Sequence, residues 1–308
     1  MAATAAVVSS RGRSVGGVAA VCQLAVEPGI PPGCEGIIER LVESASESIG
    51  KPSHPRGESV GEIPTPNVSL VAFYGSKPPP LAAFSQKLQQ RIDRALEGQF
   101  RPSPLGQIHG TLLGCEGMRR DRAIVSYWWK QRRGETRDLD LSGFLHELHC
   151  GSTFPFQLRF GGYDPEIDYG FLSRDRHPFE RSFQFRDHLA VLLGWSHRGD
   201  PHLDRFRRNA QRYNFLHKFH DRPDAIDNDF YVRIGEIIAP ISPERRSQIE
   251  TEIRHFLQSN QPIRIELTLD DLAFVRYRDF ALSPDTTQVL NARDASVKLL
   301  RAWYPAGD

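Results

Sequence analysis

A histidine and a threonine two residues apart, His109 and Thr111, are the side chains of this sequence best suited to catalysis. They fall within residues 108–114, an apolar run that ends at glycine and predicts a strand. Because residues i and i+2 of a strand project to the same face, the two side chains should lie together. An imidazole with a pKa near about 6.5 exchanges a proton at neutral pH, and a neighbouring hydroxyl can hold a phosphoryl oxygen. The pair therefore predicts proton transfer at a phosphate group.

The elements that must position this pair alternate between strands and helices. Apolar periodicity predicts strands at 68–75, 108–114, 154–160, 183–195, 230–238, 263–269 and 272–277, and helices at 81–96, 119–137, 144–149, 201–219 and 243–257. The order strand, helix, strand in 108–160 recurs in 230–277. We therefore expect an α+β fold of two pseudo-symmetric lobes of antiparallel sheet, with helices outside and a central groove.

A strand, a helix and a second strand that carries His-x-Thr resemble the two-histidine phosphoesterase superfamily, which includes cyclic phosphodiesterases and 2′-5′ RNA ligase-like enzymes. The resemblance covers roughly residues 67–280, and the first family motif matches at His109 and Thr111. It implies two lobes that each contribute one His-x-Thr or His-x-Ser strand to a shared groove.

The resemblance places the second motif on the strand at 230–235, where Tyr231 and Arg233 stand in place of the histidine and the hydroxyl residue. A tyrosine with a pKa near about 10 stays protonated at neutral pH and could act as an acid. An arginine is a permanent cation that can clamp a phosphate through two hydrogen bonds. In this hypothesis His109 is the general base, Tyr231 protonates the leaving oxygen, and Thr111 and Arg233 bind the phosphoryl group.

The resemblance and these residues together predict a metal-independent phosphodiesterase that needs no cofactor. Its substrate would be a nucleotide-type phosphodiester, such as a 2′,3′-cyclic phosphate, a 2′-5′ linkage or an RNA end. The alternative is a catalytically degenerate domain that binds a phosphorylated ligand, RNA or a protein partner without turnover. The unaltered His109 and Thr111 favour the enzyme, whereas the missing second histidine favours the binding domain.

Two other constellations suggest metal binding. His146, His149 and Cys150, together with His217 and His220, offer the nitrogen and sulfur ligands that zinc takes, but their spacing matches no established zinc pattern. Scattered histidines on helix surfaces are the simpler interpretation. The stretch 227–229 (Asp-Asn-Asp) could hold a divalent ion, although an Asx turn that leads into a strand is favoured.

A cluster of basic residues interleaved with aromatic ones suits single-stranded nucleic acid, through phosphate contacts and base stacking. The alternative is that the tryptophan pair belongs to the core. The cluster consists of Arg119, Arg120, Arg122, Lys130, Arg132, Arg133 and Arg137 with Tyr127, Trp128 and Trp129.

Composition and charge limit the other classes of protein to which this chain could belong. The 308 residues carry a net charge of +1, which argues against a protein that coats polyanions and gives no strong indication of DNA binding. The basic residues are 33 Arg and six Lys, a bias that suits phosphate ligands or reflects GC-rich coding DNA. No apolar run is long enough to span a membrane, and the four Cys form no CxxC motif, which favours a reducing compartment, the cytoplasm.

The N-terminal segment differs in composition from the rest of the chain. Residues 1–66 are rich in Gly, Pro, Ser and Ala and are predicted to be mostly disordered, ahead of a globular domain at 67–308 whose second lobe starts near residue 228. The first 26 residues contain arginine and no acid, which is typical of an organellar targeting leader and also of a plain disordered extension.

Overall fold

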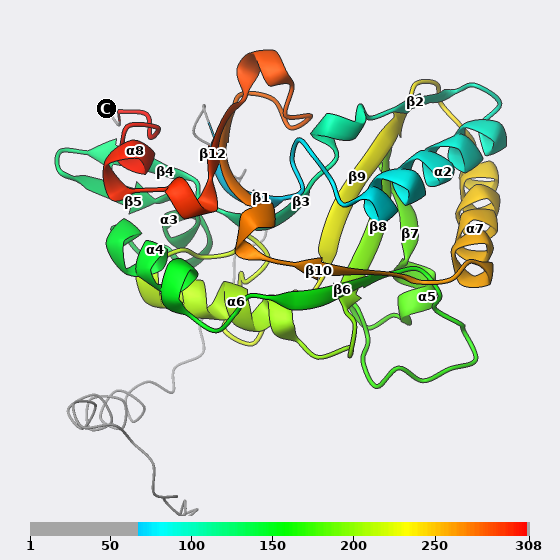
Figure 1. Ribbon diagram of the computed structural model, residues 1–308, viewed down its shortest axis with the longest axis horizontal. Helices are drawn as coiled ribbons and strands as arrows, with labels where there is room; N and C mark the ends of the chain where they lie inside the picture. The colour runs from blue at the N-terminus through cyan, green and yellow to red at the C-terminus, as the bar shows by residue number, and fades with distance from the viewer. Residues whose placement is uncertain (1–66, 307–308) are drawn as a thin grey trace, which may run out of the picture. The chain divides into compact units, whose positions relative to one another are not determined.

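The computed structural model describes residues 67–306. The predicted disordered segment or targeting leader at 1–66 lies outside this range. The described chain forms one large antiparallel sheet with helices packed against it, so the α+β class expected from the sequence is confirmed (Figure 1).

Ten strands form the large sheet, and β4 (Gly117–Arg120) pairs with β5 (Ala123–Ser126) in a separate hairpin. The order along the sheet is β10-β6-β8-β9-β3-β1-β11-β12, with β2 beside β9 and β7 beside β8. The strands are β1 (Asn67–Ala72), β2 (Phe100–Pro102), β3 (Gly110–Gly114), β6 (Phe156–Phe160), β7 (Phe183–Arg186), β8 (Leu189–Ser196), β9 (Phe230–Ile237), β10 (Ile263–Leu267), β11 (Leu272–Tyr277) and β12 (Gln288–Asn291).

The path along the large sheet consists of two four-stranded halves that meet where β3 lies beside β9. Only Gly110 and Val232 are paired across this junction, so the halves are joined by a short ladder. The halves interleave in sequence: β6, β7 and β8 precede β9 and lie on its side of the junction, whereas β11 and β12 return to β1. The half built on β9 therefore starts at β6, earlier than the position near 228 expected for a second lobe.

Two 17-residue helices, α2 (Pro79–Ala95) and α7 (Pro243–Ser259), pack on one face of the sheet and against each other. Each helix has proline in its first turn. Backbone N–H groups of the first turn have no acceptor within the helix, and proline has no N–H to leave unpaired. Ser242 caps α7 by accepting a hydrogen bond from the Arg245 N–H at 3.2 Å. The other helices are α3 (Tyr127–Arg133), α4 (Leu141–Cys150), α5 (Pro178–Arg181), α6 (His202–Ala210) and α8 (Val297–Arg301).

Alternation along β9 separates the apolar core from a polar face. Phe230, Val232 and Ile234 are buried in the main core with the apolar sides of α2 and α7. Tyr231 and Arg233 project to the opposite face, as residues at odd positions of one strand must. That face carries two smaller apolar clusters, one around Val71 and Val275 and one around Leu193 and Trp195, with polar residues between them.

Two predicted helices are wrong in part. Residues 117–126 form the β4–β5 hairpin, because Asp121 adopts a φ of +52° that reverses the chain and lets Ile124 reach the core. The helix expected over 201–219 ends earlier. A 3-10 turn follows α6, and Asn214 terminates it in the left-handed conformation with a φ of +64°.

Glycine at position 110 makes the junction of β3 and β9 possible. A Cβ atom at Gly110 would overlap the ring of Phe230. We expect Gly110→Ala to lower the free energy of unfolding by about 1–3 kcal/mol through overpacking, as measured by urea denaturation. Gly106→Ala is the matched control, since a Cβ there has nothing within 4 Å, and should change stability by less than about 0.5 kcal/mol.

The clash also has a specific partner. In a double-mutant cycle, Phe230→Leu should recover part of the loss caused by Gly110→Ala, because the shorter side chain leaves room for the methyl group. Strict additivity of the two substitutions would contradict this account of the junction.

Candidate active site

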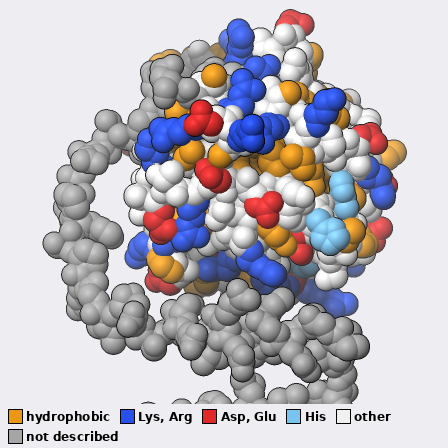
Figure 2. Space-filling model, turned by 90° about the vertical axis from the view of Figure 1, so that its left-hand side faces the viewer, with side chains coloured by type: hydrophobic (Ala, Val, Ile, Leu, Met, Phe, Trp, Pro, Cys, Tyr) orange, Lys and Arg blue, Asp and Glu red, His pale blue; other side chains and the backbone are white. Residues whose placement is uncertain are grey.

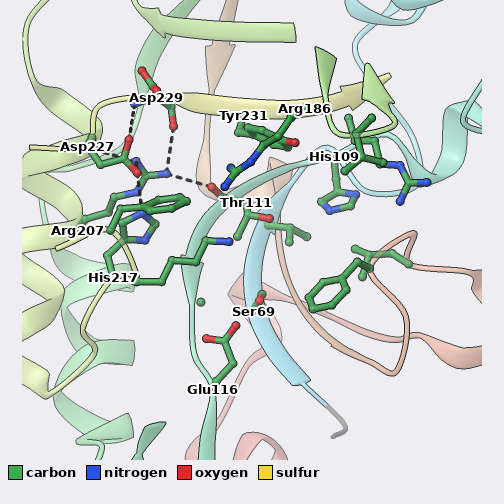
Figure 3. A pocket seen from close by; sticks show the side chains of 18 of the residues that line it. Ser69, His109, Thr111, Glu116, Arg186, Arg207, His217, Asp227, Asp229 and Tyr231 are labelled. Carbon is green, nitrogen blue, oxygen red and sulfur yellow. Dashed lines mark hydrogen bonds and ion pairs between the residues drawn. The ribbon is translucent and has the colours of Figure 1, made fainter. Parts of the chain in front are cut away.

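A pocket of about 310 Å³ opens on the polar face of the sheet, and all four residues singled out by the sequence line it. His109, Thr111, Tyr231 and Arg233 come from the two strands at the junction and from the residue just before β3. Ser69, Val71 and Tyr277 extend the same face, and the segments 174–187, 217–229 and 280–282 supply the other walls. Figure 3 shows Thr111 near the middle, with His109 on one side and His217, Asp227 and Arg207 on the other.

The register of β3 and β9 explains why these four side chains meet. Gly110 is paired with Val232 in an antiparallel ladder. Neighbours on either side of such a pair also face each other, so Thr111 lies across from Tyr231, and His109 lies across from Arg233. All four project to the side opposite Phe230, into the pocket.

The ring of His109 is held in a single tautomer. Its Nδ1 lies 2.6 Å from the main-chain oxygen of Gln107, and because a carbonyl only accepts, Nδ1 must carry the proton. Nε2 is then left with a lone pair. Burial lowers the pKa of His109 to about 4, with smaller contributions from the charges of Lys77 and Arg233 that act against the Gln107 bond. The imidazole is therefore neutral, and able to accept a proton, throughout the physiological pH range.

The hydroxyls of Thr111 and Tyr231 make no hydrogen bond to any residue in the range 67–306. Burial raises the pKa of Tyr231, so this phenol keeps its proton at neutral pH. Both groups can donate to an anionic oxygen in the pocket.

Arg233 has one edge engaged and one edge free. Its Nη2 donates to Glu236 Oε2 at 2.6 Å, which fixes the guanidinium, while its buried Nε finds no acceptor among the described residues. A buried N–H without a partner is costly, so this donor favours an acceptor brought by a ligand.

Sequence reasoning did not anticipate a buried ionic network at the other end of the pocket. Asp227 and Asp229 lie in the loop that enters β9 and are 4% and 6% exposed. His217 Nε2 donates to Asp227 Oδ2 at 2.8 Å, and Arg181 Nη2 donates to Asp229 Oδ2 at 2.8 Å. Trp195 Nε1 and the Ser173 hydroxyl also donate to Asp229 Oδ1, at 2.8 and 2.6 Å. The charge of Arg207 and the His217 bond outweigh burial and hold the pKa of Asp227 well below its usual range.

Arg207 is the centre of this network and is 2% exposed. Its guanidinium donates to four main-chain carbonyls: those of Leu112 and Asp227 at 2.8 Å and those of Thr111 and Asp229 at 3.2 Å. Arg207 belongs to α6, and its hydrogen bonds therefore connect this helix both to β3 and to the loop that precedes β9. A sequence signal existed, because Leu203, Phe206 and Ala210 form the apolar stripe of α6 and position 207 falls within it.

The Asp227–Asp229 stretch forms the Asx turn favoured from the sequence, with the Asp229 N–H 3.4 Å from Asp227 Oδ1. The histidines proposed as zinc ligands have other partners: His149 contacts the Ala292 carbonyl at 2.8 Å, and His220 bonds Asp204 at 2.9 Å. Within 67–306, no group of three or more His, Cys, Asp or Glu side chains is placed to hold a metal ion.

The tryptophans of the basic–aromatic cluster belong to the interior. Trp128 and Trp129 are buried, and the Arg137 guanidinium covers the Trp129 ring at 3.8 Å from its centroid. They are not available to stack bases, whereas Arg119, Arg120 and Arg122 on the β4–β5 hairpin are exposed. Figure 2 looks onto this end of the described chain, where Lys and Arg side chains are interspersed with acidic and apolar ones.

Comparison with known proteins leaves the family open. No family model and no curated protein matches the chain. Among solved structures, TT0787 of Thermus thermophilus is 15% identical over 73% of this chain and 93% of its own, with a TM-score of 0.35. ATU0111, a conserved protein of unknown function from Agrobacterium tumefaciens, is 17% identical over 66% and 82%, with a TM-score of 0.33. Such low scores carry no argument about fold or function.

No helix in the described range is long and apolar enough to cross a bilayer.

The role of Arg207 can be tested by stability measurements. We expect Arg207→Met to lower the free energy of unfolding by about 3–5 kcal/mol, because it leaves buried carbonyls without their donor and the buried Asp227 carboxylate without its main counter-charge. Arg205→Met, on the same helix but exposed and paired only with Asp200, is the control and should cost less than about 1 kcal/mol. Equal losses for the two variants in urea denaturation would contradict the central role of Arg207.

Proposed function

We propose that this protein is a metal-independent phosphodiesterase of the two-histidine phosphoesterase type, acting on a nucleotide-type phosphodiester such as a 2′,3′-cyclic phosphate or a 2′-5′ linkage. The observation that carries the proposal is the meeting of His109, Thr111, Tyr231 and Arg233 in one pocket. The pocket is lined by six Arg and Lys against four Asp and Glu side chains, a positive balance that suits a phosphate in a chain of nearly neutral charge.

The chemistry follows from the protonation states of the site. Nε2 of His109 removes a proton from the attacking water as its oxygen bonds to phosphorus. The bond from phosphorus to the ribose oxygen breaks, and Tyr231 donates its proton to that leaving oxygen. Proton return from the imidazolium to the phenolate restores both groups. Thr111 and Arg233 donate to the non-bridging oxygens, where negative charge accumulates in the transition state.

A binding domain that has lost turnover is the second candidate. The side chain opposite Thr111 is a phenol of raised pKa, which gives up its proton less readily than an imidazolium would. The fixed guanidinium of Arg233 suits phosphate binding with or without chemistry.

The decisive variant is His109→Ala. Hydrolysis of 2′,3′-cyclic nucleotides and of short 2′-5′ and 3′-5′ linked RNAs by the full chain is measured with EDTA present. We expect turnover by the native chain and at least about a 100-fold loss in the variant, because the general base is removed. His255→Ala, on the exposed side of α7, is the matched control and should retain full activity.

Unchanged turnover by His109→Ala would overturn the mechanism. No turnover by the native chain, together with nucleotide binding that is lost in Arg233→Ala, would establish the binding domain instead.

The lowered pKa of His109 predicts an unusual pH profile. The base must be neutral to act, so kcat/KM should stay level from about pH 5 to 8 and decline as His109 becomes protonated, with a midpoint near its pKa of about 4. An unperturbed histidine would move the decline up to about 6.5. kcat/KM is measured at each pH, and circular dichroism at the same pH values shows whether the protein is still folded. A midpoint near about 6.5 in folded protein would contradict the assignment.

A further inference from the structure

Three cations gather around one aromatic ring at the end of the pocket away from His109. The Arg174, Lys218 and Arg186 charges lie 4.6, 4.9 and 5.9 Å from the centroid of the Phe219 ring. All four side chains line the pocket. Cations repel one another, so such a group is stabilised only in part by the ring and favours an anion between or beside its members.

Two of these cations have no counter-charge in direct contact. Lys218 and Arg186 form neither a hydrogen bond nor an ion pair with any side chain or carbonyl that the structure describes. Arg174 is only loosely engaged, at 3.9 Å from Asp227 and 3.6 Å from Asp229. Arg174, Arg186 and Lys218 are all exposed at the surface of the pocket, so a ligand can reach their charges.

The acidic residues of the pocket do not form close ion pairs with Lys218 or Arg186. Asp227 and Asp229 already have Arg207 and Arg181 as their partners. Glu116 accepts a hydrogen bond from Trp128 Nε1 at 2.7 Å and acts on Lys218 only through space, without a direct ion pair between the two side chains. Asp187 is exposed beside Arg186 and forms no ion pair with a residue in 67–306. The three cations are therefore available to a ligand.

Two members of this group, Lys218 and Phe219, lie away from His109, whereas Arg186 lies beside Tyr231 and reaches toward the predicted reaction centre. His109 and His217 lie on opposite sides of Thr111 in Figure 3, and Lys218 and Phe219 follow His217 directly in the chain. Arg233 provides a guanidinium on the His109 side. The pocket thus has two positive regions, with the hydroxyls of Thr111 and Tyr231 between them.

We propose that Arg174, Arg186 and Lys218 form a second phosphate subsite, so that the preferred substrate carries a second phosphate besides the reacting phosphodiester. This inference rests on the proposed function for the identity of the reacting group. A second phosphate arises either as a 5′-phosphate on the same nucleoside or as the internucleotide diester of a longer RNA end. The shared chemistry is a phosphate held by unpaired cations beside an aromatic ring.

Direct binding tests the subsite without requiring turnover. Calorimetry with the full chain compares adenosine 3′-monophosphate with adenosine 3′,5′-bisphosphate and with the 3′-phosphorylated dinucleotide of adenosine. We expect at least one of the larger ligands to bind about tenfold or more tightly than the monophosphate, and which one does so identifies the source of the second phosphate.

Lys218→Met and Arg186→Met should each reduce this advantage to about threefold or less, and in Lys218→Met the affinity for the monophosphate should stay within about twofold. Lys298→Met and Arg198→Met remove the same charges from exposed positions outside the pocket and should preserve the full advantage. Thermal unfolding confirms that each variant is folded.

Equal affinity for all three ligands, an advantage that survives both pocket substitutions, or no binding of any ligand would overturn the subsite. The proposed function fails separately: absent hydrolysis with an intact binding advantage removes only the chemistry, and hydrolysis with equal affinities removes only the subsite.

Discussion

The buried guanidinium of Arg207 is the interaction on which the pocket depends. A cation removed from water is tolerated only when its N–H groups and its charge are satisfied. Here four main-chain carbonyls and the Asp227 carboxylate do so, and they belong to β3 and to the loop that enters β9. The same bonds therefore set the position of one strand against the other across a junction that has a single paired position. Without this constraint, the alignment of Thr111 with Tyr231 would rest on the shared apolar core, including the fit of Gly110 against Phe230.

One physical cause, burial, acts on the two titratable groups of the junction in opposite senses. Removal from water disfavours any charged form, so it lowers the pKa of the His109 imidazole and raises that of the Tyr231 phenol. The result is a proton acceptor and a proton donor that both stay in their neutral forms at neutral pH. The nearby guanidinium of Arg233 reinforces the neutral state of His109. The pocket is positive because its arginines are permanently charged, while its histidines are not.

The parts of the molecule that follow from local sequence could be predicted, and the parts that depend on distant contacts could not. The strands β3 and β9 have the alternation that places His109, Thr111, Tyr231 and Arg233 on one face, and the Ser242–Pro243 start of α7 is a local signal. The β4–β5 hairpin was missed because its polar residues resemble a helix surface until the reversal at Asp121 is known. The cations around Phe219 come from separate segments of the chain, and no short-range pattern joins them. Arg207 was visible as a charge within an apolar stripe, but its acceptors were not.

The two halves of the sheet contribute unequal chemistry to the junction, and this inequality has a mechanistic consequence. Two equivalent histidines could exchange the roles of acid and base, since each can hold or release a proton near neutral pH. A phenol of raised pKa cannot serve as the base there. An imidazole with a pKa of about 4 is unprotonated at neutral pH, so it cannot begin the reaction as the acid. Under the proposed mechanism the attacking oxygen must then lie on the His109 side and the leaving oxygen on the Tyr231 side. Under this mechanism, the pairing of His109 with Tyr231 restricts the direction in which a phosphodiester can lie across the pocket. This direction decides whether the rest of a longer ligand extends toward Arg233 or toward Lys218.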